Sequence, residues 1–379
     1  MRIAVPAETD PGEARVAATP ETVKKYLALG AQVAVQSQAG AKSGIPDADY
    51  VAAGAVIAED AMSVVADADI ILRVRRPHPK SLAGAKRGAV VLAIADPYDQ
   101  AEALQHVAET GVLLFAMELM PRITRAQVMD VLSSQANLAG YRAVIDAAAE
   151  FGRAFPMMMT AAGTVPAAKL FIMGVGVAGL QAIATARRLG AIVTATDVRP
   201  ATKEQVVSLG AKFIAVEDDE FKQAETAGGY AKEMSAAYQE KQKALTASHI
   251  AKQDVVITTA LIPGRKAPVL ITEAMVASMR PGSVIIDLAV ERGGNCELSK
   301  PGEVVTSENG VKIVGHLNVA GRLAATASAL YARNLFAFAE TLIDKSAKAV
   351  AINWDDELVK ATLLTKDGGL AHPNFQTAA

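Results

Sequence analysis

The chain has 379 residues, a formal net charge of −2 and 51% hydrophobic residues, a composition that allows two ordinary domain cores. The small net charge argues against nucleic acid as a main partner, and the single cysteine, Cys296, excludes an internal disulfide and a cysteine-rich zinc site. The five histidines show no i, i+4 pairing, so we expect no metal site built on histidine.

The first third of the chain alternates short apolar segments with helical ones. The segment at 2–5 is too short and too close to a charge to be a signal peptide, and it is interpreted as the first strand. Thr19-Pro20 is a good helix start, because a capping residue precedes proline at the first helical position. Further strands are expected at 31–36, 69–74, 89–95 and 112–117. This alternation predicts a parallel sheet in an N-terminal α/β domain over residues 1–125.

Two long helices are expected near the ends of this domain's two chain segments. A helix over 124–150 would join it to a second domain at 126–321, and a helix over 323–343 would lead to an apolar run at 350–352. We expect residues 322–379 to return to the first domain and complete it.

The second domain carries a complete dinucleotide-binding pattern. An apolar strand runs into Gly174-Val175-Gly176-Val177-Ala178-Gly179, which opens an Ala-rich helix, and the next strand, 192–196, ends on Asp197. In this pattern Gly174 permits a tight turn, Gly176 lets the backbone approach a pyrophosphate, and Gly179 lets helix pack on strand. The helix N-terminus favours the phosphates. The pattern predicts a Rossmann domain, and the alternative is a tight turn in a fold that has lost its ligand.

The residues after the second strand of this pattern bear on the choice of nucleotide. Asp197 can accept hydrogen bonds from the adenine-ribose hydroxyls and would repel a 2′-phosphate, which favours NAD over NADP. Val198 follows it, and Arg199 is able in principle to accommodate that phosphate. The acid has the greater weight because it ends the strand, where the ribose should lie.

The rest of the second domain contains one unusually long connection. Its later strands are expected at 212–216, 254–259, 283–288 and 312–314. The charged segment 217–253 separates two strands that are expected to be adjacent, and it predicts a mobile loop or lid, with a solvated excursion as the alternative. The apolar stretch 154–186 is broken by Lys169, prolines and glycines, whereas a spanning helix needs about 20 continuous apolar residues. We therefore expect a soluble, cytoplasmic chain.

Several segments resemble one family in particular. Residues 121–135, 158–166, 258–264 and 286–291 are similar to the NAD(H)-binding (alpha, peripheral) component of proton-translocating NAD(P) transhydrogenase, in the alanine dehydrogenase/transhydrogenase family. Residues 224–234 resemble that family's mobile loop, and the Arg15 segment resembles its dehydrogenases. The resemblance implies two Rossmann-like domains with parallel sheets, joined by long helices, with the NAD site in the cleft.

The resemblance also implies roles for individual residues. Four of them would hold and orient the nicotinamide of NAD(H): Arg122, Gln127, Asp130 and Ser133. Tyr230, beside Gly229, would close over the nucleotide, and Gln242 and Leu261 would line its adenosine or ribose side. Without the resemblance, the first four would be interpreted as a capped helix start with exposed polar residues, and Leu261 as core.

Hydride transfer between two nicotinamides moves no proton to or from a side chain, so catalysis would rest on positioning and on exclusion of water. An amino acid dehydrogenase needs more groups. Arg15 is retained from that set, but Arg73, Asp96 and Glu291 stand where those dehydrogenases carry lysine, histidine and aspartate.

The sequence is therefore interpreted as the NAD(H)-binding subunit of a transhydrogenase that passes hydride from NADH to NADP⁺ on a partner subunit. The resemblance implies a homodimer, an NADP(H)-binding subunit and a membrane-embedded proton-channel subunit, which would hold the chain peripherally at the inner membrane. The alternatives are a free-standing alanine or opine-type dehydrogenase and a nucleotide-sensing subunit without chemistry.

Overall fold

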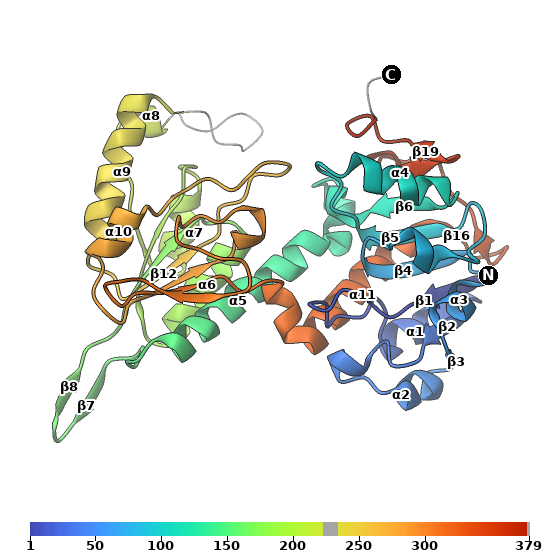
Figure 1. Cartoon of the computed structure of the whole chain (residues 1–379), viewed down its shortest axis with the longest axis horizontal. Coiled ribbons are helices and arrows are strands. Elements are labelled where there is room, and N and C mark those ends of the chain that lie inside the picture. Colours follow the sequence, from blue (N-terminus) through green and yellow to red (C-terminus); the bar gives the residue numbers. More distant parts are fainter. Residues whose placement is uncertain (223–233, 377–379) are drawn as a thin grey trace. The chain divides into compact units, whose positions relative to one another are not determined.

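The computed structural model describes residues 1–222 and 234–376, which divide into two compact units (Figure 1). Unit 1 comprises Met1–Gln135 together with the segment from Ala320 onward, and unit 2 comprises Ala136–Val319. Among the described residues, no helix has both the length and the hydropathy that crossing a bilayer requires.

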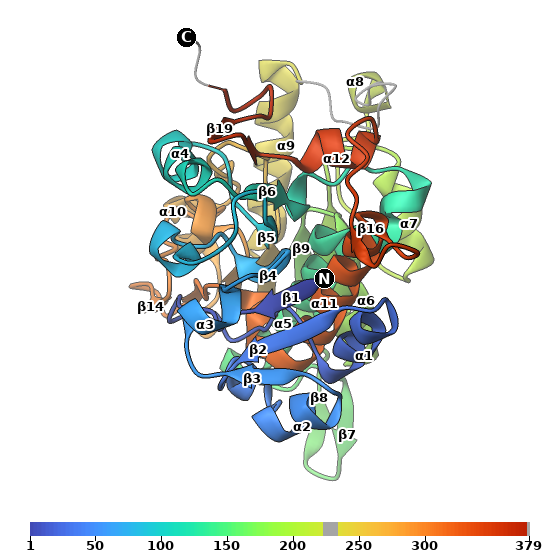
Figure 2. The same cartoon turned by 90° about the vertical axis from the view of Figure 1, so that its right-hand side faces the viewer.

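Unit 1 contains a parallel sheet in the order β3-β2-β1-β4-β5-β6, from the bottom to the top of Figure 2. The five predicted strands are present, and the structure adds the short edge strand β3, whose three residues are only partly covered. The strands are β1 Arg2–Val5, β2 Gln32–Gln36, β3 Val56–Ala58, β4 Ile70–Arg75, β5 Val90–Ile94 and β6 Leu113–Ala116.

Helices cover both faces of this sheet, which is why its central strands are apolar throughout. Ile70 and Leu72 of β4 pack in the core under α1, α2 and α11, whereas Ile71 packs in the core under α3 and α4. The helices are α1 Pro20–Ala28, α2 Asp47–Ala52, α3 Ala61–Val65, α4 Ala101–Glu109, α11 Ala324–Thr341 and α12 Glu357–Thr362, with 3₁₀ turns η1 Ala41–Ser43, η2 Pro79–Leu82, η3 Met117–Leu119, η4 Thr124–Met129 and η6 Val319–Leu323.

The C-terminal segment packs into unit 1. Tyr331, Leu335 and Phe338 of α11 are fully buried in the core of this unit. Two small antiparallel hairpins follow, β16 Ile343–Asp344 with β17 Ala349–Val350 and β18 Thr365–Lys366 with β19 Gly369–Leu370.

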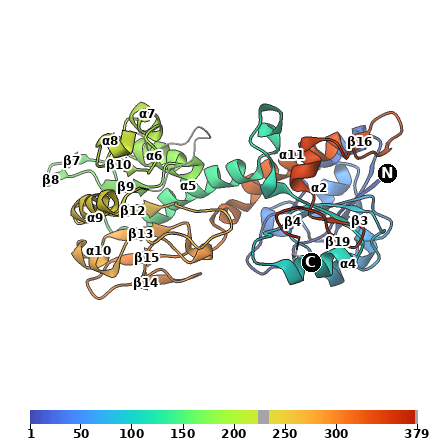
Figure 3. The ribbon, with the colours of Figure 1, turned by 90° about the horizontal axis from the view of Figure 1, so that it is seen from above.

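Unit 2 contains a second, larger sheet in the order β11-β10-β9-β12-β13-β15-β14, in which only the β14–β15 pair is antiparallel. Figure 3 shows β10, β9, β12, β13, β15 and β14 in this order. The strands are β9 Lys169–Met173, β10 Ile192–Thr196, β11 Lys212–Phe213, β12 Val255–Thr258, β13 Val284–Asp287, β14 Val304–Thr306 and β15 Lys312–Val314.

The helices of unit 2 also lie on both faces of its sheet. Leu170 and Ile172 of β9 share a core with α5, α6 and α7, while Phe171 and Met173 face α10 and the end of α9. A hairpin, β7 Met158–Thr160 with β8 Gly163–Val165, projects from the unit (Figure 1). The helices are α5 Val131–Glu150, α6 Val177–Arg188, α7 Thr202–Ser208, α8 Asp219–Lys222, α9 Ala236–Ile250 and α10 Glu273–Ser278, with a 3₁₀ turn η5 Val290–Arg292.

The single helix expected over 124–150 is wrong, because it is interrupted at Asp130. Thr124–Met129 form the 3₁₀ turn η4, Asp130 has an extended ψ of 93°, and α5 starts at Val131. The Asp130 carboxylate accepts a hydrogen bond from the Ser133 N–H at 2.8 Å, as an N-cap does. The side chain of Asp130 thus starts a new helix where the apolar pattern continues.

The expectation of a long loop over 217–253 is wrong for most of its length. Helices α8 and α9 occupy 219–222 and 236–250, and β11 ends at Phe213. The strands on either side of the segment, β11 and β12, are separated in the sheet by β10 and β9. The connection must therefore cross two strands, and α9 serves as its crossover helix. Residues 223–233 lie outside the described residues.

Candidate functional site

The glycine-rich turn links β9 to α6 at the carboxyl end of the unit 2 sheet. Gly174 has φ +103°, a conformation that glycine adopts without strain. A Cβ on Gly179 would lie 1.9 Å from the Gly174 carbonyl oxygen, so only glycine lets α6 pack this closely on the turn. A Cβ on Gly176, by contrast, would meet no atom within 4 Å. Gly176 therefore borders open space at the helix N-terminus, where a pyrophosphate would gain backbone N–H groups.

Asp197 is held tightly at the end of β10. One of its carboxylate oxygens accepts the Val175 N–H of the glycine turn at 2.7 Å, and the other accepts the backbone N–H of Arg199 at 2.9 Å. The Arg199 guanidinium also pairs with this carboxylate through Nε at 2.9 Å and Nη2 at 3.0 Å. The side chain of Asp197 is only 6% exposed as a result. A ribose hydroxyl must therefore share the carboxylate with Arg199 or replace it.

An apolar rim surrounds this turn. Val198 and Leu261 are 57% and 52% exposed, and Val177 and Ile262 are also exposed. These residues follow β10, β12 and β9, three neighbouring strands whose carboxyl ends meet at one edge. Leu261 is therefore not a core residue. Exposed apolar side chains grouped at the carboxyl edge of a parallel sheet are typical of a ligand site.

Gln242 of α9 is engaged with the sheet. Its Oε1 accepts the Val216 N–H at 2.9 Å, and its Nε2 lies 3.4 Å from Thr196 Oγ1 at the end of β10. The side chain thus ties α9 to the same edge of the sheet. Gly229 and Tyr230, which were expected to cover the nucleotide, lie outside the described residues.

The four residues expected at the nicotinamide lie in unit 1, around the start of α5. Asp130 and Ser133 form the helix cap described above, strengthened by a hydrogen bond of 2.5 Å from Ser133 Oγ to the Asp130 carboxylate. Arg122 and Gln127 are exposed, and their side chains make no hydrogen bond to any other residue that the structure describes. The capped helix start is thus present, and beside it stand two side chains with uncommitted donors.

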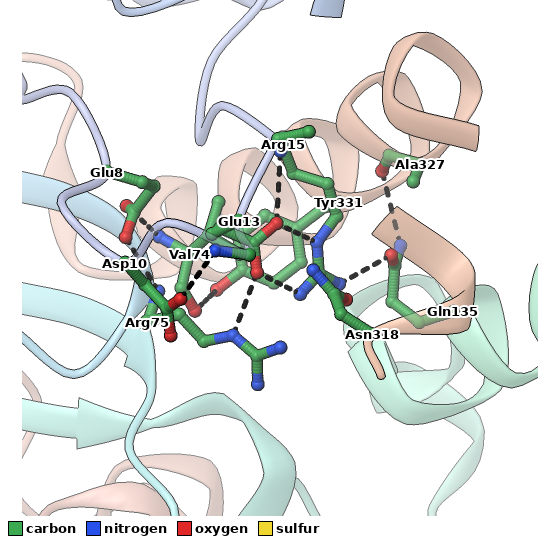
Figure 4. A network of polar contacts seen from close by, with 12 residues as sticks. Glu8, Asp10, Glu13, Arg15, Val74, Arg75, Gln135, Asn318, Ala327 and Tyr331 are labelled. Carbon is green, nitrogen blue, oxygen red and sulfur yellow. Dashed lines mark hydrogen bonds and ion pairs between the residues drawn. The ribbon is translucent and has the colours of Figure 1, made fainter. Parts of the chain in front are cut away.

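The Arg15 segment forms a buried polar network in unit 1 (Figure 4). The Arg15 guanidinium donates to both carboxylate oxygens of Glu13 at 2.7 Å and to Gln135 Oε1 at 2.8 Å. Arg75 Nε donates to the same Glu13 carboxylate at 2.8 Å. Binding a substrate carboxylate to Arg15, as an amino acid dehydrogenase requires, would mean displacing the carboxylate of Glu13.

The other three positions compared with the dehydrogenases are also engaged. Arg73 is buried and pairs with Glu8 at 3.2 Å, and burial raises the pKa of Glu8 against the opposing charge of Arg73. Asp96 has φ +47°, and its N–H donates to the buried carboxylate of Glu118. Glu291 accepts the Asn318 N–H.

Glu13 makes the stability of unit 1 sensitive to acid. Burial alone would raise its pKa, but the hydrogen bonds and charge of Arg15 and the charge of Arg75 lower that pKa to about 2. A lowered carboxylate pKa stabilises the fold above the unfolded value of 4.5, and this stabilisation is lost as the pH falls towards about 2. We therefore expect Glu13→Gln to lower the free energy of unfolding by up to about 3 kcal/mol near neutral pH.

The measurement is urea unfolding of the wild-type and Glu13→Gln proteins between about pH 6 and about pH 3. The difference between the two should shrink as the pH falls, because both side chains are then uncharged. The opposing effect of Glu8 is present in both proteins and cancels in the comparison. A difference that stays constant with pH would contradict the assignment.

Two features of the site were missed from the sequence. Glu13 stands only two residues before Arg15, and its charge next to a retained arginine was the available signal. Asp287 and Asn295 form a buried network behind Leu261, signalled by an acid at a strand end followed by Gly293-Gly294.

Comparisons with known proteins agree over the whole chain. The family model "Alanine dehydrogenase/PNT, N-terminal domain" matches residues 4–139, and "Alanine dehydrogenase/PNT, C-terminal domain" matches residues 143–373. The chain is 55% identical to an NAD(P) transhydrogenase subunit alpha protein of Rhodospirillum rubrum, over 98% of each chain. It is 44% identical to NAD(P) transhydrogenase subunit alpha of Cereibacter sphaeroides, over 98% of this chain and 71% of that one. The crystal structure of transhydrogenase from Sinorhizobium meliloti superposes with a TM-score of 0.89 and 60% identity, covering 98% of this chain and 100% of that one.

Proposed function

Since this chain belongs to the alanine dehydrogenase/PNT family, which binds NAD(H), we propose that it is the NAD(H)-binding subunit of a proton-translocating transhydrogenase. In this role it passes hydride from NADH to NADP⁺ held on a partner subunit. The observation that carries the proposal is the turn at Gly174–Gly179, where open space beside Gly176 meets the N-terminus of α6 and the Asp197 carboxylate.

We propose that the adenosine and pyrophosphate bind to unit 2. The phosphates take the N–H groups at the start of α6, from Val177, Ala178 and Gly179. The adenosine lies against the apolar rim that includes Val198 and Leu261. NAD(H) supplies the hydride and the electrons when bound, so this unit needs to offer only shape and hydrogen bonds.

Asp197 is proposed to set the nucleotide preference. We expect calorimetry on the purified chain to show strong binding of NADH and little or none of NADPH, because the 2′-phosphate would be brought next to a carboxylate. Asp197→Ala should weaken NADH binding by about 1–3 kcal/mol, since it removes the acceptor for the ribose and also releases the Val175 N–H.

Glu204→Ala is the matched control, because it removes an exposed carboxylate from α7. It should leave both affinities unchanged. Equal affinity of the wild-type protein for NADH and NADPH would overturn the assignment.

We propose that unit 1 orients the nicotinamide. The Asp130–Ser133 cap fixes the start of α5, and Arg122 and Gln127 offer donors that no described residue uses. Such donors suit a carboxamide or a ribose. Their effect is to place the ring for transfer, because most of the binding area of NAD(H) belongs to the adenosine and pyrophosphate.

Gln127→Asn separates orientation from binding, since it keeps the amide and withdraws it by one methylene. We expect the rate of hydride transfer to fall at least about tenfold, with the affinity for NADH changed by less than about twofold. Stopped-flow hydride transfer and calorimetry measure the two quantities. Gln105→Asn on α4 is the control and should change neither. A loss that appears wholly as weaker NADH binding would count against an orienting role.

We propose that the protein acts as a homodimer and in a complex at the inner membrane. The β7–β8 hairpin supports self-association, because Met157, Met158 and Met159 are exposed on it, Met159 by 79%. Exposed apolar segments of this kind mark protein interfaces. The NADP(H)-binding and proton-channel functions then reside on partner subunits, which hold this cytoplasmic chain peripherally at the membrane.

The alternative, a free-standing amino acid dehydrogenase, is disfavoured by the network around Arg15. Glu13 already occupies the guanidinium that would bind a substrate carboxylate, and Arg73 is paired with Glu8. Breaking a buried ion pair costs several kcal/mol. This cost would have to be met by every substrate molecule that binds.

A further inference from the structure

A buried carboxylate at the end of β13 organises the loop that follows it. Asp287 is 1% exposed, and its oxygens accept the backbone N–H groups of Ala289, Asn295 and Cys296 at 2.9, 2.8 and 3.1 Å. Two hydroxyls add to these donors, Ser299 Oγ at 2.6 Å and Thr258 Oγ1 at 3.2 Å. A carboxylate with this many donors fixes the surrounding backbone.

The chain can wrap around Asp287 only because two glycines precede Asn295. Gly293 and Gly294 have φ +95° and +80°, and a Cβ on Gly294 would lie 2.9 Å from Asp287 Oδ2. The turn aims the backbone N–H of Asn295 at the carboxylate. It also directs the Asn295 side chain, which is fully buried, towards the loop after β12.

Asn295 holds one peptide unit of that loop from two sides. Its Oδ1 accepts the Ala260 N–H at 3.0 Å, and its Nδ2 donates to the Ala260 carbonyl at 2.9 Å and to the Pro268 carbonyl at 2.8 Å. Both polar atoms of the side chain are thus used to fix residues that lie more than 25 positions earlier in the chain.

The residue held in this way lies between the glycine turn and the apolar rim. Immediately before Ala260, Thr259 Oγ1 donates to the Gly174 carbonyl at 3.0 Å. Immediately after it, Leu261 and Ile262 are about half exposed. A shift of the Ala260 peptide would move Leu261 relative to the turn that is proposed to bind the pyrophosphate.

We infer that Asn295 is a positioning residue for the adenosine half of NAD(H): anchored by Asp287, it holds the Ala260 peptide so that Leu261 and Ile262 stand at a fixed place beside the glycine turn. The inference rests on the proposed binding of adenosine at this edge of unit 2. Asn295 itself touches no ligand in this arrangement and acts through Ala260.

The test compares Asn295→Ala with Asn309→Ala in the full-length protein. Asn309 is a matched control, because its Nδ2 also donates to backbone carbonyls, at 3.0 Å to Val276 and 3.0 Å to Met279, but at the end of α10, before β13 begins. Calorimetry with NADH and with ADP-ribose gives the affinities, and urea unfolding gives the stability of each variant.

We expect Asn295→Ala to weaken the binding of NADH and of ADP-ribose by the same factor, about three- to tenfold, because the defect lies in the adenosine half. In hydride transfer to an NADP(H)-binding partner, KM for NADH should rise with kcat unchanged. Asn309→Ala should lower stability and leave both affinities as they are. Asn295→Asp keeps the acceptor for the Ala260 N–H but loses both donated bonds, and we expect it to bind NADH no better than Asn295→Ala.

A double-mutant cycle keeps the test decisive if Asn295→Ala is poorly folded. Leu261→Ala alters an exposed side chain, and combined with Asn295→Asp it should cost less than the sum of the two single losses. Additive losses, or an equal loss in Asn309→Ala, would overturn the positioning role, as would unchanged affinity in a folded Asn295→Ala. Failure of the wild-type protein to bind NADH would instead overturn the proposed function.

Discussion

The isolated protein is expected to bind NADH and to catalyse no hydride transfer until an NADP(H)-binding transhydrogenase component is added. The chain has one dinucleotide fingerprint, at Gly174–Gly179, and it is proposed to hold one nicotinamide. The second nicotinamide must be brought by a partner, since transfer requires the two C4 atoms in near-attack contact. With the partner present, transfer between NADH, or its acetylpyridine analogue, and the NADP(H) pool should be rapid and is followed by absorbance.

The same experiment separates the alternatives. Alanine, lysine and the corresponding oxo acids should support no NAD⁺ or NADH turnover by the isolated chain, because Arg15 and Arg73 are paired internally with Glu13 and Glu8. Robust alanine-dependent reduction of NAD⁺ would favour the dehydrogenase. Silence with every partner tried would favour a nucleotide-sensing subunit.

The second large effect is expected at two glycines that lie three residues apart. Gly176→Ala should leave the fold intact, because its Cβ meets no atom within 4 Å, but should weaken NADH binding at least about tenfold by filling the space beside the phosphates. Gly179→Ala should lower the free energy of unfolding by about 1–3 kcal/mol or more, because its Cβ would lie 1.9 Å from the Gly174 carbonyl oxygen.

Urea unfolding and calorimetry distinguish the two variants. The pair is its own control, since both make the same chemical change in the same turn. Loss of stability in Gly176→Ala, or a fully stable Gly179→Ala, would show that the turn is not built as described.

Local patterns were sufficient to predict much of this protein. The strands of both sheets lie within a few residues of their predicted positions, because each buried parallel strand is a short apolar run between polar turns. Thr19-Pro20 starts α1 as expected, with Thr19 and Thr22 forming a capping box. The glycine pattern predicted a nucleotide-binding turn, because backbone conformation and close packing at Gly174 and Gly179 depend on neighbours in the sequence.

Other features were decided by contacts between segments that are distant in sequence. The order of β11, β10, β9 and β12 determined that 217–253 is mainly a crossover, which the length of the connection alone did not reveal. Arg15 has the same sequence context whether it binds a substrate or is paired, and its contacts with Glu13, Arg75 and Gln135 appear only in the folded unit.

The same division holds at the nucleotide edge. The sequence determined that Asp197 ends a strand next to a glycine turn, and the tertiary structure decided that its carboxylate is shared by Val175 and Arg199. Leu261 looked like core by composition, yet it is half exposed because the Asn295 side chain holds the preceding peptide. Periodicity and turn chemistry act over a few residues and can be predicted locally, whereas the partners of a buried polar group are chosen only when the sheet brings distant loops together.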